Sequence, residues 1–309
     1  MTTRTVCCAA LLAMAGAPAL AATPIHQARP LSAAGNVSID NLKGRIVVRT
    51  WGRAEVGITG TLGEGVEKLV VEGTADDLRI EVRYPSGGGS WFGWGGKGGQ
   101  GEPSVIEVSV PAGAGVKVDS VSANVDITGV AGRTLAVDTV SGNVVVRAAR
   151  PGEARIDTVS GDVELDLQTG SIAVDSVSGD VRITGKVSGT VDIGTVSGDA
   201  DLSAGRLQRL SVSSVSGDTR LKAALAPGGR ITTDSVSGGL TLSLARDTSA
   251  RLRVETFSGD ISSPVGAVKT EQYGPGKTLD TRLGTGSGEI RLESFSGDVR
   301  INFDQVPGI

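Results

Sequence analysis

Aspartates that recur at one position of a repeated motif are the side chains best placed to do chemistry in this chain. Asp162, Asp180, Asp199 and Asp218 lie 18 or 19 residues apart, each at the end of a Val-Ser-Gly-Asp tetrapeptide. Carboxylate oxygens are ligands that calcium takes, so these four residues form a candidate calcium site. The chain nevertheless lacks the Gly-Gly-x-Gly-x-Asp repeat of calcium-binding solenoids. The alternative is that Ser and Asp satisfy backbone groups at corners of the chain.

A second row of carboxylates precedes the motif valines, so the repeats offer many carboxylate pairs. Such pairs are the catalytic groups of glycosidases, which makes a carbohydrate-active β-helix enzyme an alternative function. Two features count against it, since the repeats are nearly free of aromatic residues for sugar stacking and carry no long loop to form a cleft. The second row comprises Asp119, Asp138, Asp157, Asp175 and Asp234.

The segment 86–101 is the other candidate binding element. It is almost entirely Gly and Ser, as a flexible linker is, but it also holds Trp91, Phe92 and Trp94, three of the nine aromatic residues. Aromatic side chains in an exposed loop can contact a membrane interface or a partner. The alternative is that they fold back as a hydrophobic cap on the end of the molecule.

Several function classes are excluded by composition. His26 is the one histidine, and Cys7 and Cys8 are the two cysteines. These residues cannot build a zinc cluster, a Cys–His nucleophile pair or a disulfide framework. The formal net charge is −4 and no basic stripe is present, so we expect no nucleic-acid partner. We expect no cofactor either, calcium excepted.

The positions of all these residues follow from an internal repeat. The motif recurs from residue 121 to 298 at intervals of 18 to 21 residues, with one interval of 38. Each unit reads as strand, turn, strand, turn, and no segment has a helical period. The repeat predicts an all-β, single-chain β-solenoid with coils of about 19 residues, in which the motif valines stack as a core spine and Ser-Gly-Asp lines one edge. A degenerate copy lies upstream at Ile39–Ile46.

The chain divides into four predicted segments. Residues 1–21 have the charged start, apolar core and small-residue cleavage site of a signal peptide, and 22–35 reads as a disordered lead-in. Residues 36–110, with the loop 86–101, form less regular β coils or a cap, and 111–309 form the regular repeats. The alternative to a continuous solenoid is a β-sandwich-like first half followed by the solenoid. No second apolar segment follows, so we expect an exported protein without a transmembrane segment, in the periplasm or at the cell surface.

The chain resembles a bacterial family of exported β-strand-repeat proteins described as adhesins, a domain class without an assigned activity. The matching residues are Asn41–Trp51, Val108–Gly113 and the Val-Ser-Gly-Asp units, and the resemblance spans about 36–303. It implies an envelope location and provides no catalytic residues to carry over.

Together these observations predict an exported, non-catalytic envelope protein that is an adhesin or a binding or structural module. Its partner would be a cell-envelope component or another envelope protein, bound by a rigid solenoid surface. The alternatives are the carbohydrate-active enzyme and a calcium-stabilised structural module.

Overall fold

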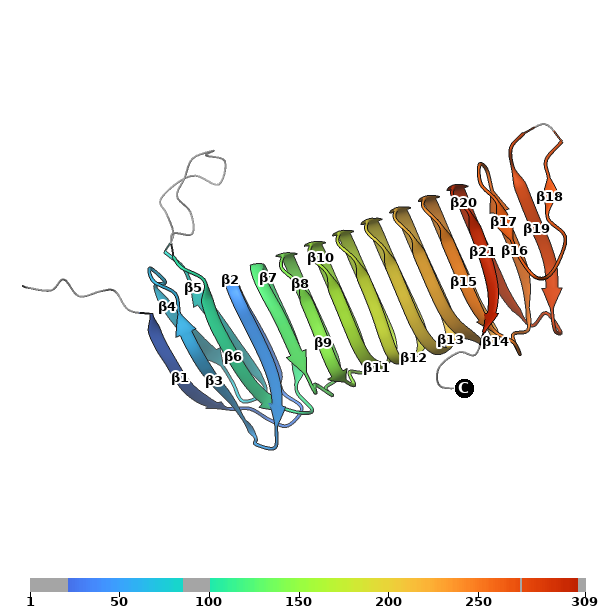
Figure 1. Cartoon of the computed structure of the whole chain (residues 1–309). Coiled ribbons are helices and arrows are strands. Elements are labelled where there is room, and N and C mark those ends of the chain that lie inside the picture. Colours follow the sequence, from blue (N-terminus) through green and yellow to red (C-terminus); the bar gives the residue numbers. More distant parts are fainter. Residues whose placement is uncertain (1–21, 86–100, 273, 305–309) are drawn as a thin grey trace, which may run out of the picture.

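A computed structural model of the chain describes residues 22–85, 101–272 and 274–304 (Figure 1). All regular structure in these ranges is β-strand, so the all-β prediction is confirmed. No membrane-spanning helix occurs in the described part of the chain. The residues predicted to form a signal peptide, 1–21, lie outside it.

The strands fall into a less regular first group and a long regular series. The first six are β1 (Thr23–Pro30), β2 (Asn36–Trp51), β3 (Glu55–Leu62), β4 (Lys68–Gly73), β5 (Asp77–Arg83) and β6 (Ser104–Pro111). The regular series comprises β7 (Gly115–Thr128), β8 (Thr134–Ser141), β9 (Val144–Ala149), β10 (Glu153–Ser160), β11 (Val163–Ser178), β12 (Val181–Ser197), β13 (Ala200–Ser216) and β14 (Thr219–Ser237).

Seven further strands form the C-terminal end. They are β15 (Leu240–Ala245), β16 (Ala250–Thr256), β17 (Ile261–Ser262), β18 (Lys269–Thr270), β19 (Lys277–Leu283), β20 (Gly288–Ser296) and β21 (Val299–Asp304).

In the middle of the molecule, successive repeats pair in parallel and in register. Asp157 of β10 faces Asp175 of β11, Ser176 faces Thr195 of β12, and Ser214 of β13 faces Ser235 of β14. Equivalent motif positions therefore lie beside one another on neighbouring strands, and the repeats form a stack (Figure 1). Strands in such a ladder are about 4.8 Å apart, so each motif position becomes a row along the stack.

The glycine of each motif is required by the corner it occupies. Gly179 has a φ of +124° and Gly198 a φ of +126°, values that residues with a Cβ rarely adopt. A Cβ on Gly198 would overlap the carbonyl oxygen of Gly179, and a Cβ on Gly179 would overlap that of Gly161. The degenerate upstream copy has the same corner, because Gly44 has a φ of +119°.

The core lies between the two strand segments of each repeat and is made by strict alternation. In β11 and β12, Ile172, Val174, Val181 and Ile183 are buried, while Arg182 points to solvent. The inward position before the corner is taken by a small polar residue, Ser176, which is 4% exposed.

The prediction that the motif valines form the core spine is wrong. Val177 is 47% exposed, and its equivalents in the other repeats are exposed to a similar degree. The alternation continues through Ser176 without a bulge, so the side chain of Val177 falls on the outer face. The core spine is built instead by residues on both sides of the motif, such as Val174 and Val181.

The lead-in predicted to be disordered contains a strand. Within 22–35, β1 pairs antiparallel with β3 over its whole length, and Ile25 is buried against the core. The free edge of β3 supplies the backbone partners that this short polar segment cannot provide for itself.

At both ends, the order of strands in space departs from the order in the chain. Strand β2 lies between β7 on one side and β5 and β6 on the other. At the C-terminal end, β20 lies between β14 and β16, and β21 pairs with both β15 and β17. Antiparallel strand β19 then covers the outer edge of β16.

Candidate functional site

Three residues of each repeat, just before the corner, build a surface feature that runs along the stack. They are a carboxylate, a buried hydroxyl and an exposed apolar residue, as in Asp175-Ser176-Val177. The first and third side chains lie on the same outer face, because residues two apart in a strand do so. In register, they form two parallel rows along the stack, which we call the acidic row and the apolar row.

The acidic row comprises Asp40, Asp119, Asp138, Asp157, Asp175, Asp234, Glu293 and Glu255, with Gly194 and Ser213 interrupting it. The apolar row comprises Val121, Val140, Val159, Val177, Val196, Val215, Val236, Phe295 and Phe257.

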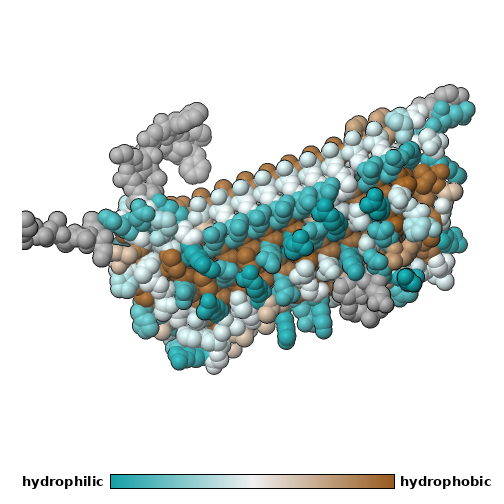
Figure 2. Space-filling view, viewed as in Figure 1, coloured by the Kyte–Doolittle hydropathy of each residue, from teal (hydrophilic) through white to brown (hydrophobic). Residues whose placement is uncertain are grey.

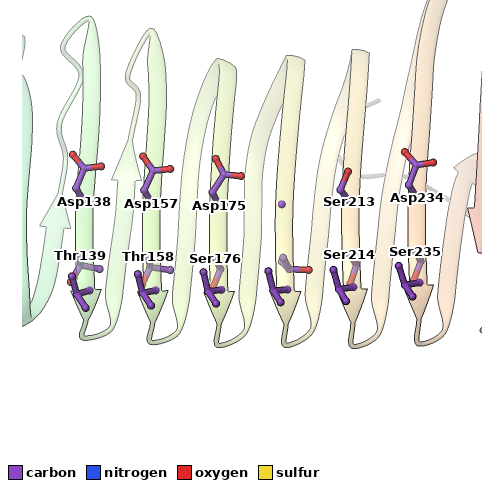
Figure 3. A pocket seen from close by; sticks show the side chains of 18 of the residues that line it. Asp138, Thr139, Asp157, Thr158, Asp175, Ser176, Ser213, Ser214, Asp234 and Ser235 are labelled. Atoms are coloured by element: carbon purple, nitrogen blue, oxygen red, sulfur yellow. The ribbon is translucent and has the colours of Figure 1, made fainter.

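A long groove of about 1290 Å³ follows these two rows from one end of the stack to the other. Figure 3 shows part of it, with the side chains of Asp138, Asp157 and Asp175 in one row and the hydroxyl residues in the next. The two walls are separated by two residues of strand, which is roughly 7 Å. The groove is therefore narrow and straight, with one acidic and one apolar side.

The apolar row is unusual for its exposure. Its valines are 45% to 50% exposed and its two phenylalanines 55% and 57%. In Figure 2 a brown row follows the upper edge of the stack, with a pale row and then a teal row beside it. A continuous exposed apolar row of this length is typical of an interaction surface.

The hydroxyl residues between the two rows are buried. Ser120 and Thr139 share a hydrogen bond of 2.9 Å between their hydroxyl oxygens. The hydroxyl oxygens of Thr158, Ser176 and their next neighbours Thr195 and Ser214 have no partner among the described residues. These small side chains fill the inward position at the corner and line the groove between the two rows.

Cations lie along the acidic row but are fewer than the carboxylates. The Lys117 Nζ lies 2.8 Å from an oxygen of Asp119 and 3.4 Å from one of Asp138, and its pKa is raised chiefly by the hydrogen bond to Asp119. The Arg155 guanidinium lies 2.8 Å from Asp157 and 3.6 Å from Asp175. Each cation thus serves two carboxylates, and the wall keeps an excess of negative charge.

The N-terminal end of the groove holds a carboxyl group with a raised pKa. Burial raises the pKa of Asp40. The hydrogen bond from Arg79, at 2.9 Å, and the charge of Arg79 lower it, whereas the charges of Asp119 and Glu81 raise it. Burial is therefore the main cause of the raised pKa, and the neighbouring carboxylates add a smaller contribution.

The four aspartates of the calcium hypothesis form a different row, on the other side of the corner. The backbone N–H of Asp180 donates to a carboxylate oxygen of Asp162 at 3.1 Å, and the same contact links Asp199 to Asp180 and Asp218 to Asp199 at 2.9 Å. The pKa of Asp199 is lowered by the Asp218 N–H and by Arg220. One oxygen of each carboxylate is therefore committed to the backbone of the next repeat.

Over residues 22–85, 101–272 and 274–304, no group of three or more His, Cys, Asp or Glu side chains is placed to hold a metal ion. Calcium takes six to eight oxygen ligands. This row leaves at most one carboxylate oxygen per repeat, and in Asp199 and Asp218 that oxygen accepts a hydrogen bond from Arg220. The geometry agrees with the corner-satisfying role that the sequence offered as the alternative.

The predicted binding residues Trp91, Phe92 and Trp94 lie outside the described residues. The structure instead reveals the apolar row, which sequence reasoning placed in the core. The signal was present in the sequence, because alternation through Ile172, Val174 and Ser176 assigns Val177 to the outer face. It was overlooked because a polar residue, Ser176, takes the inward position beside Val177.

Comparison with known proteins gives one family and several distant structures. A family model described as Toastrack DUF4097 matches residues 34–302. No curated protein matches the chain.

Three crystal structures are similar to the chain at low identity. A "putative lipid binding protein" from Parabacteroides distasonis is 13% identical, with 92% of this chain and 97% of that chain covered and a TM-score of 0.48. A "putative adhesin" from Bacteroides fragilis is 13% identical, with 91% and 97% covered and a TM-score of 0.40. Another from Parabacteroides merdae is 10% identical, with 92% and 97% covered and a TM-score of 0.32. These similarities are too distant to indicate what this chain binds.

Proposed function

The chain belongs to the Toastrack DUF4097 family, and from this premise we propose that it is an exported, non-catalytic binding module of the cell envelope. Its repeats form a rigid β-solenoid, and the groove between the acidic and apolar rows is the binding surface. The partner is an elongated envelope component with an apolar side and a cationic side.

The observation that carries this proposal is the exposure of the apolar row. In a soluble protein, side chains such as Val177 gain by leaving water, at roughly 25 cal/mol per Å² of apolar surface. A row of nine such side chains, each about half exposed, offers this gain to a partner that lies along the whole stack. An isolated exposed valine would need no explanation, but a continuous row does.

The groove is also formed before the partner arrives. In the central repeats, each strand that carries it is hydrogen-bonded to a strand on either side. Binding therefore requires little ordering of the protein, which reduces the entropy cost of association. The excess of carboxylates over cations along one wall favours a partner with positive groups and disfavours nucleic acid and anionic lipid surfaces.

Binding of residues 22–309 to fractionated envelope tests the proposal. Purified protein is sedimented with sacculi, outer-membrane vesicles and lipid vesicles, beside the variant Val159→Thr/Val177→Thr. Threonine keeps the shape of valine but makes the apolar row more polar. We expect saturable binding to one fraction, weakened by about tenfold in the variant through the loss of apolar burial.

The matched control is Val105→Thr/Val268→Thr, since these two valines are 38% and 40% exposed but lie outside the apolar row. The control should bind like the unmodified protein. Absence of binding to every fraction, or equal weakening in both variants, would contradict the proposed binding surface.

We also propose that Trp91, Phe92 and Trp94 contribute a second contact to the same partner. The prediction rests on three aromatic residues in a Gly-rich segment. The variant Trp91→Ala/Phe92→Ala/Trp94→Ala in the same assay separates the two contacts. If this variant loses binding while Val159→Thr/Val177→Thr binds fully, the contact lies in the segment 86–101 and not in the groove.

A further inference from the structure

The apolar row changes character at one end of the groove. Its last two members are phenylalanines, Phe295 on the strand β20 and Phe257 just after β16, and β20 and β16 are neighbours in space. Their rings are stacked, with centroids 5.0 Å apart and planes inclined by 6°. They are the most exposed residues of the row, at 57% and 55%. Phe295 covers one face of the Phe257 ring and leaves the opposite face free of this contact.

The acidic row changes at the same place. Glu255 and Glu293 stand two residues before the phenylalanines, where most repeats carry Asp, and Asp234 precedes Val236 on the next strand. Arg291 hydrogen-bonds to Glu293, and the charges of Glu255 and Asp234 raise its pKa further. One guanidinium thus faces three carboxylates, and neither Glu255 nor Asp234 has an ion pair of its own among the described residues.

The strand pair β18–β19 closes this end of the groove. Glu271, Lys277 and Thr278 line the groove beside Phe257, and Lys277 is already paired with Asp260. A ligand group that enters here meets an aromatic face, unpaired carboxylates and a wall on the far side. The central part of the groove offers only valine methyl groups and a carboxylate wall interrupted at Gly194 and Ser213.

From this geometry we infer that the C-terminal end of the groove is a subsite for an arginine side chain of a polypeptide partner. The guanidinium is flat and weakly hydrated, so it can lie against the Phe257 ring and donate to the Glu255 carboxylate. The excess of negative charge at this end selects a cation over a neutral ring or an anion. The inference rests on the proposed binding function of the groove, and it names one chemical group of the partner.

A short labelled peptide in which arginine alternates with valine is the probe. Its control is the same peptide with citrulline in place of arginine, which keeps the shape and removes the charge. Binding to residues 22–309 is measured by fluorescence anisotropy at low and high salt. The test variants are Phe257→Val/Phe295→Val and Glu255→Gln. The double variant should fold normally, because valine occupies the same position in the other repeats.

We expect each test variant to bind the arginine peptide roughly threefold to tenfold more weakly, the size of a partly desolvated cation–π or charge-assisted contact. The citrulline peptide should bind weakly to all proteins. Unchanged affinity of Phe257→Val/Phe295→Val, or equal binding of the two peptides, would overturn the inference, as would no binding of the arginine peptide.

The variant Val159→Thr/Val177→Thr separates failure of the subsite from failure of the groove. If it loses peptide or envelope binding while Phe257→Val/Phe295→Val does not, the groove is a binding surface and the arginine subsite is absent. If all variants bind as the unmodified protein does, both the groove and the subsite are wrong.

Discussion

The middle of the stack and its C-terminal end are built from the same repeat but are assembled differently. From β10 to β14, each strand pairs with the next strand in the chain. At the end, the chain runs past its neighbour to form β16, turns through β18 and β19, and returns to insert β20 between β14 and β16 (Figure 1). A coil of this repeat can therefore stack on a coil that is not its neighbour in the chain.

The end differs because it must stop the stack. An unpaired edge of a regular parallel ladder is a template for another chain. Antiparallel β19 covers the edge of β16, and at the other end antiparallel β3 covers β6. The irregular segments thus protect the regular ones. They also place Phe295 and Phe257 side by side, although 38 residues separate them in the chain.

The largest expected effect tests whether the inserted coil is packed as tightly as the central coils. A Cβ on Gly198 would overlap the Gly179 carbonyl oxygen, and one on Gly297 would overlap that of Gly238 across the sequence jump. Gly198→Ala and Gly297→Ala should each lower the free energy of unfolding by roughly 3 to 6 kcal/mol. Gly170→Ala is the control, since nothing lies within 4 Å of its Cβ. Urea unfolding measures the stability of all three variants. A Gly297→Ala protein as stable as the control would contradict the position of β20 between β14 and β16.

An intermediate effect separates the core from the apolar row. Ile183 is fully buried, so Ile183→Ala should cost about 2 to 5 kcal/mol of unfolding free energy. Val177→Ala removes a side chain that is 47% exposed and should change stability by less than about 1 kcal/mol. Thermal unfolding of both variants measures the difference. Similar losses would show that the apolar row stabilises the fold and is not kept for a partner.

The smallest effect concerns two aspartates with lowered pKa values, one in the middle and one at the end. The Asp199 pKa is lowered by the Asp218 backbone N–H and then by Arg220, whereas that of Asp280 is lowered mainly by the hydrogen bond to Arg251, with Arg253 adding to it. A lowered folded-state pKa stabilises the protein at neutral pH, and this contribution is lost as the pH falls through that pKa. We expect Asp199→Asn and Asp280→Asn each to be slightly less stable than the unmodified protein at neutral pH, with the gap closing in acid.

High salt should narrow the stability difference at both sites. The effect of Asp280→Asn should fade because its partners are exposed arginines, and that of Asp199→Asn because Arg220, the cation that pairs with Asp199, is also exposed. The amide of Asp199→Asn still accepts the Asp218 N–H, as Asn143 accepts the N–H of Asp162. Melting temperatures across pH and salt measure the stability difference between each variant and the unmodified protein. A difference at either site that persists unchanged in acid would contradict the assigned cause of the lowered pKa.

Much of the candidate site was within reach of the sequence. The spacing of Asp138, Asp157 and Asp175 placed carboxylates in a row, and the structure has that row. The apolar row was missed because the pattern was judged by hydropathy, which placed Val177 inside. Backbone geometry decides the face, since side chains alternate whatever their polarity. The strand β1 was missed because its partner, β3, is distant in the chain and cannot be identified from the local sequence.

The repeat period, the strand segments and the corner glycines are determined by the amino-acid sequence, because alternation and positive φ are local requirements. The order of the coils at the two ends, the capping strands and the pairing of Phe257 with Phe295 are decided only in three dimensions. All coils present the same rows, so local preference does not rank the possible neighbours. The intervening strands β18 and β19 and the burial of the free edge of β16 select one order.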